Sequence, residues 1–270
     1  MSFKNSKLSE RKCDFFSEIA SDIAQGGTLT ELFLSRSMSL RPYSIRNIGL
    51  ILHQSNWVAT EVRGADEWKA NGVKVLTGAR PLEIFAPVKK NGKMEFVKTQ
   101  VYDVSMTTVS SMSQRLFGES LDGQLAFLNA VAQGIGWKLA YTTFKPSYTK
   151  LTYADWRTQV IYISNSAKKS LQVLMAAKEL IVLMQQEAIR TGDRVAQSYE
   201  LANSIAIASA FELCAYWGDK PPKLPMQAKK ALADDLENNL KDIHRLSCAL
   251  QKKIKEALQN FKKRNTAKTA

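Results

Sequence analysis

The spacing of apolar residues changes from a helical period to strict alternation between residues 82 and 104. Leu82, Ile84, Ala86 and Val88 alternate with other residue types, the turn-forming pair Asn91-Gly92 follows, and an extended pattern resumes over 96–104. Two alternating runs joined by such a pair predict an antiparallel β-hairpin. Because helical patterns flank this hairpin on both sides, the sequence predicts an α+β fold.

The remaining pattern is mainly helical. Apolar residues recur at helical spacing between turn signals such as Gly26-Gly27, Asn71-Gly72 and Thr191-Gly192-Asp193. We predict helices over 7–25, 65–70, 121–133, 167–190, 195–217 and 226–263. Two more helices are expected, one from 28 onward and one after Pro42, with Ser44 as the cap of the latter. Further strands are expected over 137–144 and 159–163.

A chain of 270 residues favours two compact units. Residues 107–118 are rich in Ser, Thr and Met without periodicity, so we place a linker there. We expect one domain over 1–115, a mostly helical second domain over 116–225, and a long amphipathic, basic helix with a tail over 226–270.

The apolar stripe of that last helix leaves three interpretations open. It could pack on the second domain, pair with a second copy of the chain in a homodimer, or present its lysine face to nucleic acid. The stripe comprises Leu232, Leu236, Leu240, Ile243, Leu250, Ile254, Leu258 and Phe261.

Several classes of protein are excluded by what the sequence lacks. The most apolar stretch, 171–184, carries Lys178 and Glu179, so no membrane span is expected. The first 25 residues have no secretory signal pattern, which predicts a cytoplasmic protein.

We expect Cys13, Cys214 and Cys248 to be reduced, buried thiols. Two histidines leave few ligands for a zinc site, and we expect neither a cofactor nor a bound metal.

The charge is strongly basic at both ends of the chain. Lys and Arg number 38 against 25 Asp and Glu, a formal net charge of +13. Residues 1–115 carry 16 basic and 11 acidic side chains, 116–220 carry 10 and 9, and 221–270 carry 12 and 5. Such an excess favours polyanionic partners, although it also serves solubility.

Basic and aromatic residues are interleaved in the first domain. Cations can follow phosphates while flat rings stack on unpaired bases, so this mixture is typical of single-stranded nucleic-acid binding. For Trp57 and Trp68 taken singly, a place in the core is the favoured interpretation. The candidate binding residues are Tyr43, Arg46, Trp57, Arg63, Trp68, Lys69, Lys74, Arg80, Lys89 and Lys90.

The order of residues over 40–108 resembles the N-terminal domain of ArdC-type antirestriction proteins and their LtrC-like conjugation relatives. The chain departs from the family pattern at Thr77, where a basic residue usually precedes Gly78. The resemblance implies sequence-nonspecific binding of single-stranded DNA. The matching positions are Tyr43, Ser44, Asn47, Trp68, Gly72, Gly78, Ala86, Pro87, Val88, Asp103, Val104, Ser105 and Thr107.

In those families the second domain is usually a zinc metallopeptidase of the ImmA/IrrE kind, with HExxH on a helix. Here the resemblance aligns Lys178-Glu179-Leu180-Ile181-Val182 with that motif, so both imidazole ligands are missing. Only Glu200 remains near the place of a third ligand. The resemblance therefore implies a degenerate zincin-like domain without metal or catalytic residues. Glu179 is then either a leftover general base or, as we favour, an ordinary helix charge paired with Lys178 or Arg190.

The sequence therefore predicts a non-enzymatic protein of a plasmid or phage. It would bind single-stranded DNA, or RNA, with little sequence preference and protect DNA from host defence. The competing interpretation is a protein-interaction module that binds a protein partner in the pseudo-peptidase cleft, because the middle of the chain is nearly neutral. A hydrolase with an unorthodox metal site is the third alternative.

Overall fold

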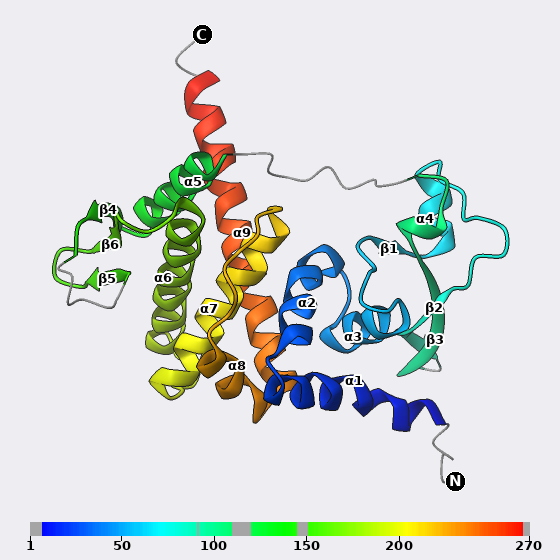
Figure 1. Ribbon diagram of the computed structural model, residues 1–270. Helices are drawn as coiled ribbons and strands as arrows, with labels where there is room; N and C mark the ends of the chain where they lie inside the picture. The colour runs from blue at the N-terminus through cyan, green and yellow to red at the C-terminus, as the bar shows by residue number, and fades with distance from the viewer. Residues whose placement is uncertain (1–6, 91, 110–119, 145–150, 267–270) are drawn as a thin grey trace. The chain divides into compact units, whose positions relative to one another are not determined.

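Figure 1 shows the computed structural model, which describes residues 7–90, 92–109, 120–144 and 151–266. The chain divides into two compact units, Met1–Leu116 and Phe117–Ala270. Each unit combines helices with a three-stranded sheet, so the predicted α+β class is confirmed. Most of the expected linker lies outside the described residues.

Four α-helices and a sheet build the described part of the first unit. Phe15 and Ile19 on α1 are buried, and Gly49 on α3 makes room for the Phe15 ring, since a Cβ at Gly49 would lie 2.0 Å from it. Ser44 caps α3 by accepting from the Asn47 amide, as predicted. The elements are α1 (Lys7–Ala24), α2 (Thr28–Ser37), α3 (Ile45–Gln54), β1 (Val62–Arg63), α4 (Ala65–Ala70), β2 (Leu82–Lys90) and β3 (Lys93–Asp103), with 3-10 turns at Met38–Leu40 and Val104–Met106.

The predicted hairpin is confirmed and forms most of the first sheet. The strand order is β1-β3-β2 with antiparallel pairing, which leaves β2 at an edge. Asn47 on α3 donates to the Phe85 carbonyl and accepts from its amide, and Gln54 does the same for Glu83. These two amides therefore satisfy the edge of β2 near α3 in the way that a neighbouring strand would.

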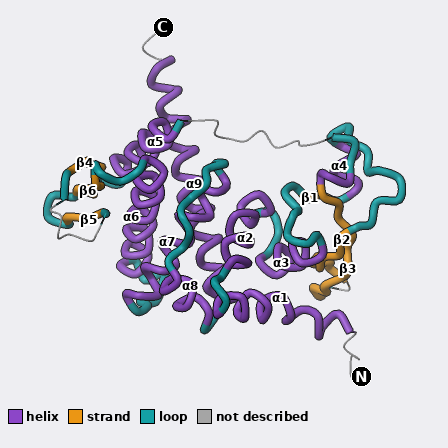
Figure 2. Tube along the Cα trace, in the orientation of Figure 1, coloured by secondary structure: helices purple, strands orange, loops and turns teal. Residues whose placement is uncertain are grey.

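Helices dominate the second unit. Residues 204–214 of α7 are buried without interruption, because α6, α8 and α9 all pack against this helix. A small sheet lies against α6, as Figures 1 and 2 show. The elements are α5 (Leu121–Gly134), β4 (Lys138–Thr142), β5 (Thr152–Asp155), β6 (Val160–Ser164), α6 (Lys169–Arg190), α7 (Tyr199–Tyr216), α8 (Met226–Ala233) and α9 (Leu236–Thr266).

The small sheet has the order β4-β6-β5, with β4 parallel and β5 antiparallel to β6. The sequence analysis predicted β4 and β6 but missed β5. Four residues are too few to show an alternating pattern, and β5 is defined by its pairing with β6.

The predicted single helix over 226–263 is wrong, because a turn at Asp234-Asp235 divides it into α8 and α9. Leu240, Ile243 and Ile254 of the apolar stripe are buried, and α9 packs against α5, α6 and α7. Of the interpretations left open for the stripe, packing within the chain is therefore the one observed. Among the described residues no helix is long and apolar enough to cross a bilayer.

Candidate functional site

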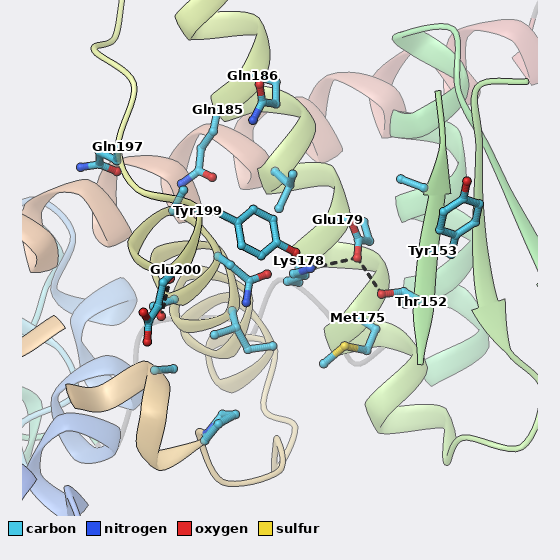
Figure 3. A pocket seen from close by; sticks show the side chains of 18 of the residues that line it. Thr152, Tyr153, Met175, Lys178, Glu179, Gln185, Gln186, Gln197, Tyr199 and Glu200 are labelled. Atoms are coloured by element: carbon cyan, nitrogen blue, oxygen red, sulfur yellow. Dashed lines mark hydrogen bonds and ion pairs between the residues drawn. The ribbon is translucent and has the colours of Figure 1, made fainter. Parts of the chain in front are cut away.

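A cleft of about 820 Å³ opens in the second unit between β5, α6 and α7. Figure 3 shows it from close by, with side chains from all three elements around it. The four positions that the sequence analysis aligned with a metal motif, Lys178, Glu179, Val182 and Glu200, all line this cleft. The tertiary structure therefore brings together residues that lie on two helices.

An ion pair between Lys178 and Glu179 lines the cleft, and the hydroxyl of Thr152 donates a hydrogen bond to the same carboxylate. Lys178 Nζ lies 3.0 Å from Glu179 Oε1, and Thr152 Oγ1 on β5 donates to the same oxygen at 2.6 Å. The Glu179 side chain is only 9% exposed. A carboxylate that accepts from an ammonium and a hydroxyl is held in place by those two partners. The predicted pairing of Glu179 with Lys178 is observed, and Arg190 pairs instead with Glu187.

These residues do not suit a dication. Zinc sites need imidazole, thiolate or carboxylate ligands, whereas Lys178 carries a positive charge and Val182 offers only an aliphatic group at the corresponding positions. Glu200 accepts a hydrogen bond from Gln227 at 3.2 Å. Over the described ranges, no three His, Cys, Asp or Glu side chains are grouped so that they could hold a metal ion.

Aromatic side chains lie around the cleft. Tyr199 is 80% exposed, Trp156 58% and Tyr153 47%. Trp156 makes an edge-to-face contact with the buried Trp137, with ring centroids 5.0 Å apart, which fixes its orientation. The lining thus combines exposed aromatic rings with the buried Lys178–Glu179 ion pair, an arrangement suited to binding.

A second candidate surface lies on the hairpin of the first unit. The β2–β3 register puts Phe85, Pro87 and Lys89 on one face with Lys98, Phe96 and Met94 opposite them. On this face Phe96 is 70% exposed and Met94 62%. The sequence analysis did not select Phe96, although the alternation within the predicted strand could have placed it opposite the buried face that Ile84 marks.

Six of the predicted binding residues have exposed side chains. Lys69 ends α4, and Lys74 and Arg80 follow it in the loop before β2. Lys89 and Lys90 lie at the distal end of β2. The exposed set is Arg46, Lys69, Lys74, Arg80, Lys89 and Lys90.

The other four predicted residues are partly or fully buried in the first unit, and for the fully buried Trp68 the assignment to the binding surface is wrong. Trp68 is fully buried, and its indole N–H donates to the Tyr102 carbonyl at 3.0 Å. Trp57 is half-buried where α3 ends, with a left-handed φ of 65°. A ring inside the core cannot stack on a base, as the favoured interpretation of Trp68 anticipated.

Arg63 and Tyr43 are also engaged within the unit. Arg63 pairs with Glu61 and Glu67, each at 3.0 Å, and its guanidinium lies 5.3 Å from the centre of the Trp68 ring. The Tyr43 hydroxyl donates to the Val62 carbonyl at 3.0 Å. Burial, with a smaller contribution from Glu67, raises the pKa of Tyr43 to about 12, so this hydroxyl stays protonated.

Comparison with known proteins shows the fold. No family model and no curated protein matches the chain. The metal-free crystal structure of the antirestriction protein ArdC from plasmid R388 is similar, with a TM-score of 0.54 and 15% identity over 91% of this chain and 98% of that one. The Mn(II)-bound crystal structure of the same protein is also similar, with a TM-score of 0.54 and 15% identity over 92% of this chain and 97% of that one. The resemblance predicted from residues 40–108 is thus confirmed at the level of structure, and this chain has the ArdC fold.

Proposed function

We propose that this protein binds single-stranded nucleic acid, with little sequence preference, through the β2–β3 hairpin and the loop that precedes it. The observation that carries the proposal is Phe96, a large ring that is 70% exposed between Met94 and Lys98 on an outward face. Isolated exposed phenylalanines need no explanation, but here Lys89 lies near the ring on β2, and Lys98, which pairs with Glu83 at 3.3 Å, lies beside it on β3. That combination provides a stacking platform beside phosphate contacts.

The exposed lysines extend this surface along the chain. Lys89 and Lys90 continue it toward the turn, and Lys69, Lys74 and Arg80 are exposed in the segment that leads into β2. Cations that are not held by internal carboxylates can release counterions when they meet phosphates. Sequence preference should be weak, because stacking and phosphate contacts do not read base edges.

The biological role that we infer is antirestriction, in the service of a plasmid or phage. It rests on the shared fold with ArdC of plasmid R388, which is described as an antirestriction protein. The second unit would then act without hydrolysis, since its cleft holds an ion pair where a peptidase needs metal ligands.

A second candidate function is binding of a protein partner in that cleft. The exposed aromatic rings of Trp156 and Tyr199 favour it, because such rings are enriched at protein interfaces. An array of extended peptides probed with the full chain would test it. Binding that disappears in a Trp156→Ala variant would support the idea, and equal binding by the variant would contradict it.

The main proposal is tested by fluorescence anisotropy with the full-length protein. Labelled single-stranded DNA, duplex DNA and single-stranded RNA are titrated between about 50 and about 200 mM salt. We expect single strands to bind more tightly than duplex, with affinity that falls steeply as salt rises. Equal, weak binding of all three would mean that the basic charge serves only solubility. Comparable binding of RNA and DNA would mean that no group reads the 2′-hydroxyl.

A further inference from the structure

A cluster of titratable side chains lies on the α7–α9 contact, among residues that the cleft and the hairpin do not use. Glu212 on α7 is fully buried, and Oε1 of its carboxylate lies 2.7 Å from Nδ1 of His244 on α9. The other ring nitrogen of His244 lies 3.8 Å from the sulfur of Cys248, one helical turn further on. The carboxylate of Glu212, the imidazole of His244 and the thiol of Cys248 therefore form a chain of contacts that crosses from α7 to α9.

This order of groups is the one that activates a thiol. A nucleophile within reach of an imidazole that a third group orients is the recurring pattern of nucleophilic sites. Glu212 favours the doubly protonated ring, so that the second ring nitrogen carries a proton where it faces the sulfur. Ser247 Oγ also donates to Glu212 Oε2, at 2.5 Å, which fixes the carboxylate that orients the ring.

The two thiols that the structure describes differ sharply in their surroundings. Cys214 on α7 is 1% exposed, and burial raises the pKa of its thiol. Cys248 is partly exposed, so the expectation that it is buried is wrong. Small oxidants can reach a partly exposed sulfur, whereas a buried thiol in apolar surroundings is inert.

We propose that Cys248 is a reactive thiol that hydroperoxides oxidise to a sulfenic acid, with His244 as its activating residue and Glu212 as the group that positions His244. In this step the sulfur attacks one peroxide oxygen and an S–O bond forms while the O–O bond breaks. The sulfur loses two electrons and the peroxide gains them. The departing oxygen takes the proton from His244 and leaves as water or an alcohol, and the proton of the thiol passes to the imidazole, which returns to its starting form. A small thiol can later reduce the sulfenic acid through a mixed disulfide.

The experiment treats the folded full-length protein with hydrogen peroxide, traps sulfenic acid with dimedone, and measures each cysteine by mass spectrometry after trypsin digestion. The three cysteines fall in different tryptic peptides, so Cys214 serves as a buried reference in every folded sample. We expect Cys248 to be labelled about tenfold faster in the folded protein than in the same protein unfolded by urea, because unfolding removes His244 from the sulfur.

Two variants separate activation from packing. His244→Gln keeps a polar side chain of similar size but cannot donate a charge-assisted hydrogen bond, and we expect it to slow Cys248 labelling about tenfold. Gln251→Ala removes a different buried hydrogen bond of α9, the one from the Trp217 indole, which involves none of Glu212, His244 and Cys248, and it should leave most of the rate intact. Labelling of Cys248 that is no faster in the folded than in the unfolded protein, or an unchanged rate in His244→Gln, would overturn the proposal.

Discussion

Lys178 lies beside Glu179 on the floor of the second unit's cleft, with 3.0 Å between the ammonium nitrogen and the carboxylate oxygen. The sequence analysis aligned this pair with a metal ligand and the general base of a peptidase motif. Both side chains are largely buried, so each charge depends on the other for compensation. The cleft is thus built around an internal ion pair and does not offer ligands to a cation.

The first prediction is that ligands can be restored at this cleft. The double variant Lys178→His/Val182→His converts residues 178–182 to an HExxH motif, with two imidazoles one helical turn apart. We expect it to bind zinc measurably in an equilibrium dialysis experiment, while the wild-type protein and the single Lys178→His variant do not. Stoichiometric zinc in the purified wild-type protein would contradict our interpretation of the cleft.

The second prediction concerns the exposed ring on the hairpin. Phe96→Ala should weaken binding of single-stranded DNA by about 1–3 kcal/mol, the typical value of one stacked base. Because Phe96 is 70% exposed, its removal should cost little stability. Tyr199→Ala, which truncates an exposed ring in the other unit, is the matched control. Anisotropy titrations that find equal weakening in both variants would remove the hairpin from the binding site.

The third prediction compares exposed lysines of the hairpin with Arg63, which is held in ion pairs within the first unit. Lys89→Ala/Lys90→Ala should reduce the slope of log affinity against log salt by about 1 for each phosphate that the variant no longer binds. Arg63→Ala should leave that slope unchanged, because Arg63 is held by Glu61 and Glu67. Urea unfolding should instead show that Arg63→Ala lowers the free energy of unfolding. A reversed pattern would mean that Arg63 leaves its partners to contact DNA.

The fourth prediction assigns Trp68 to stability. Trp68→Phe removes the hydrogen bond to the Tyr102 carbonyl and leaves part of a cavity, so we expect the free energy of unfolding to fall by about 1–3 kcal/mol. The affinity for single-stranded DNA, measured where the variant is still folded, should stay within about twofold of wild type, because a buried ring makes no stacking contact. A lower affinity with unchanged stability would return Trp68 to the binding surface.

The fifth prediction is a pH dependence of stability. Burial lowers the pKa of His244, but the hydrogen bonds to Cys248 and Glu212 and the charge of Glu212 outweigh it and raise the pKa to about 10. A folded-state pKa above the unfolded value of 6.5 means that this stabilisation is complete below about pH 6.5 and is lost as pH rises toward 10. Urea unfolding between these values should show a steeper decline for wild type than for His244→Gln. Parallel curves would mean that His244 stays neutral.

Local signals made much of the fold predictable. The Asn91-Gly92 pair fixed the position of the hairpin turn, and Ser44 identified the start of α3, because turn and cap preferences depend on a few adjacent residues. The strand β5 and the division between α8 and α9 were not predictable in this way. β5 exists through its pairing with β6, and α9 is set by packing on α5, α6 and α7.

The candidate sites show the same division. The sequence by itself determined that Lys178 and Val182 cannot replace metal-binding histidines, because that conclusion depends only on residue type. Only the tertiary structure decided that Glu212, His244 and Cys248 meet, although 32 residues separate the first two. The physical reason is that burial and side-chain contact are properties of elements packed together, which residue type and spacing along the chain do not specify.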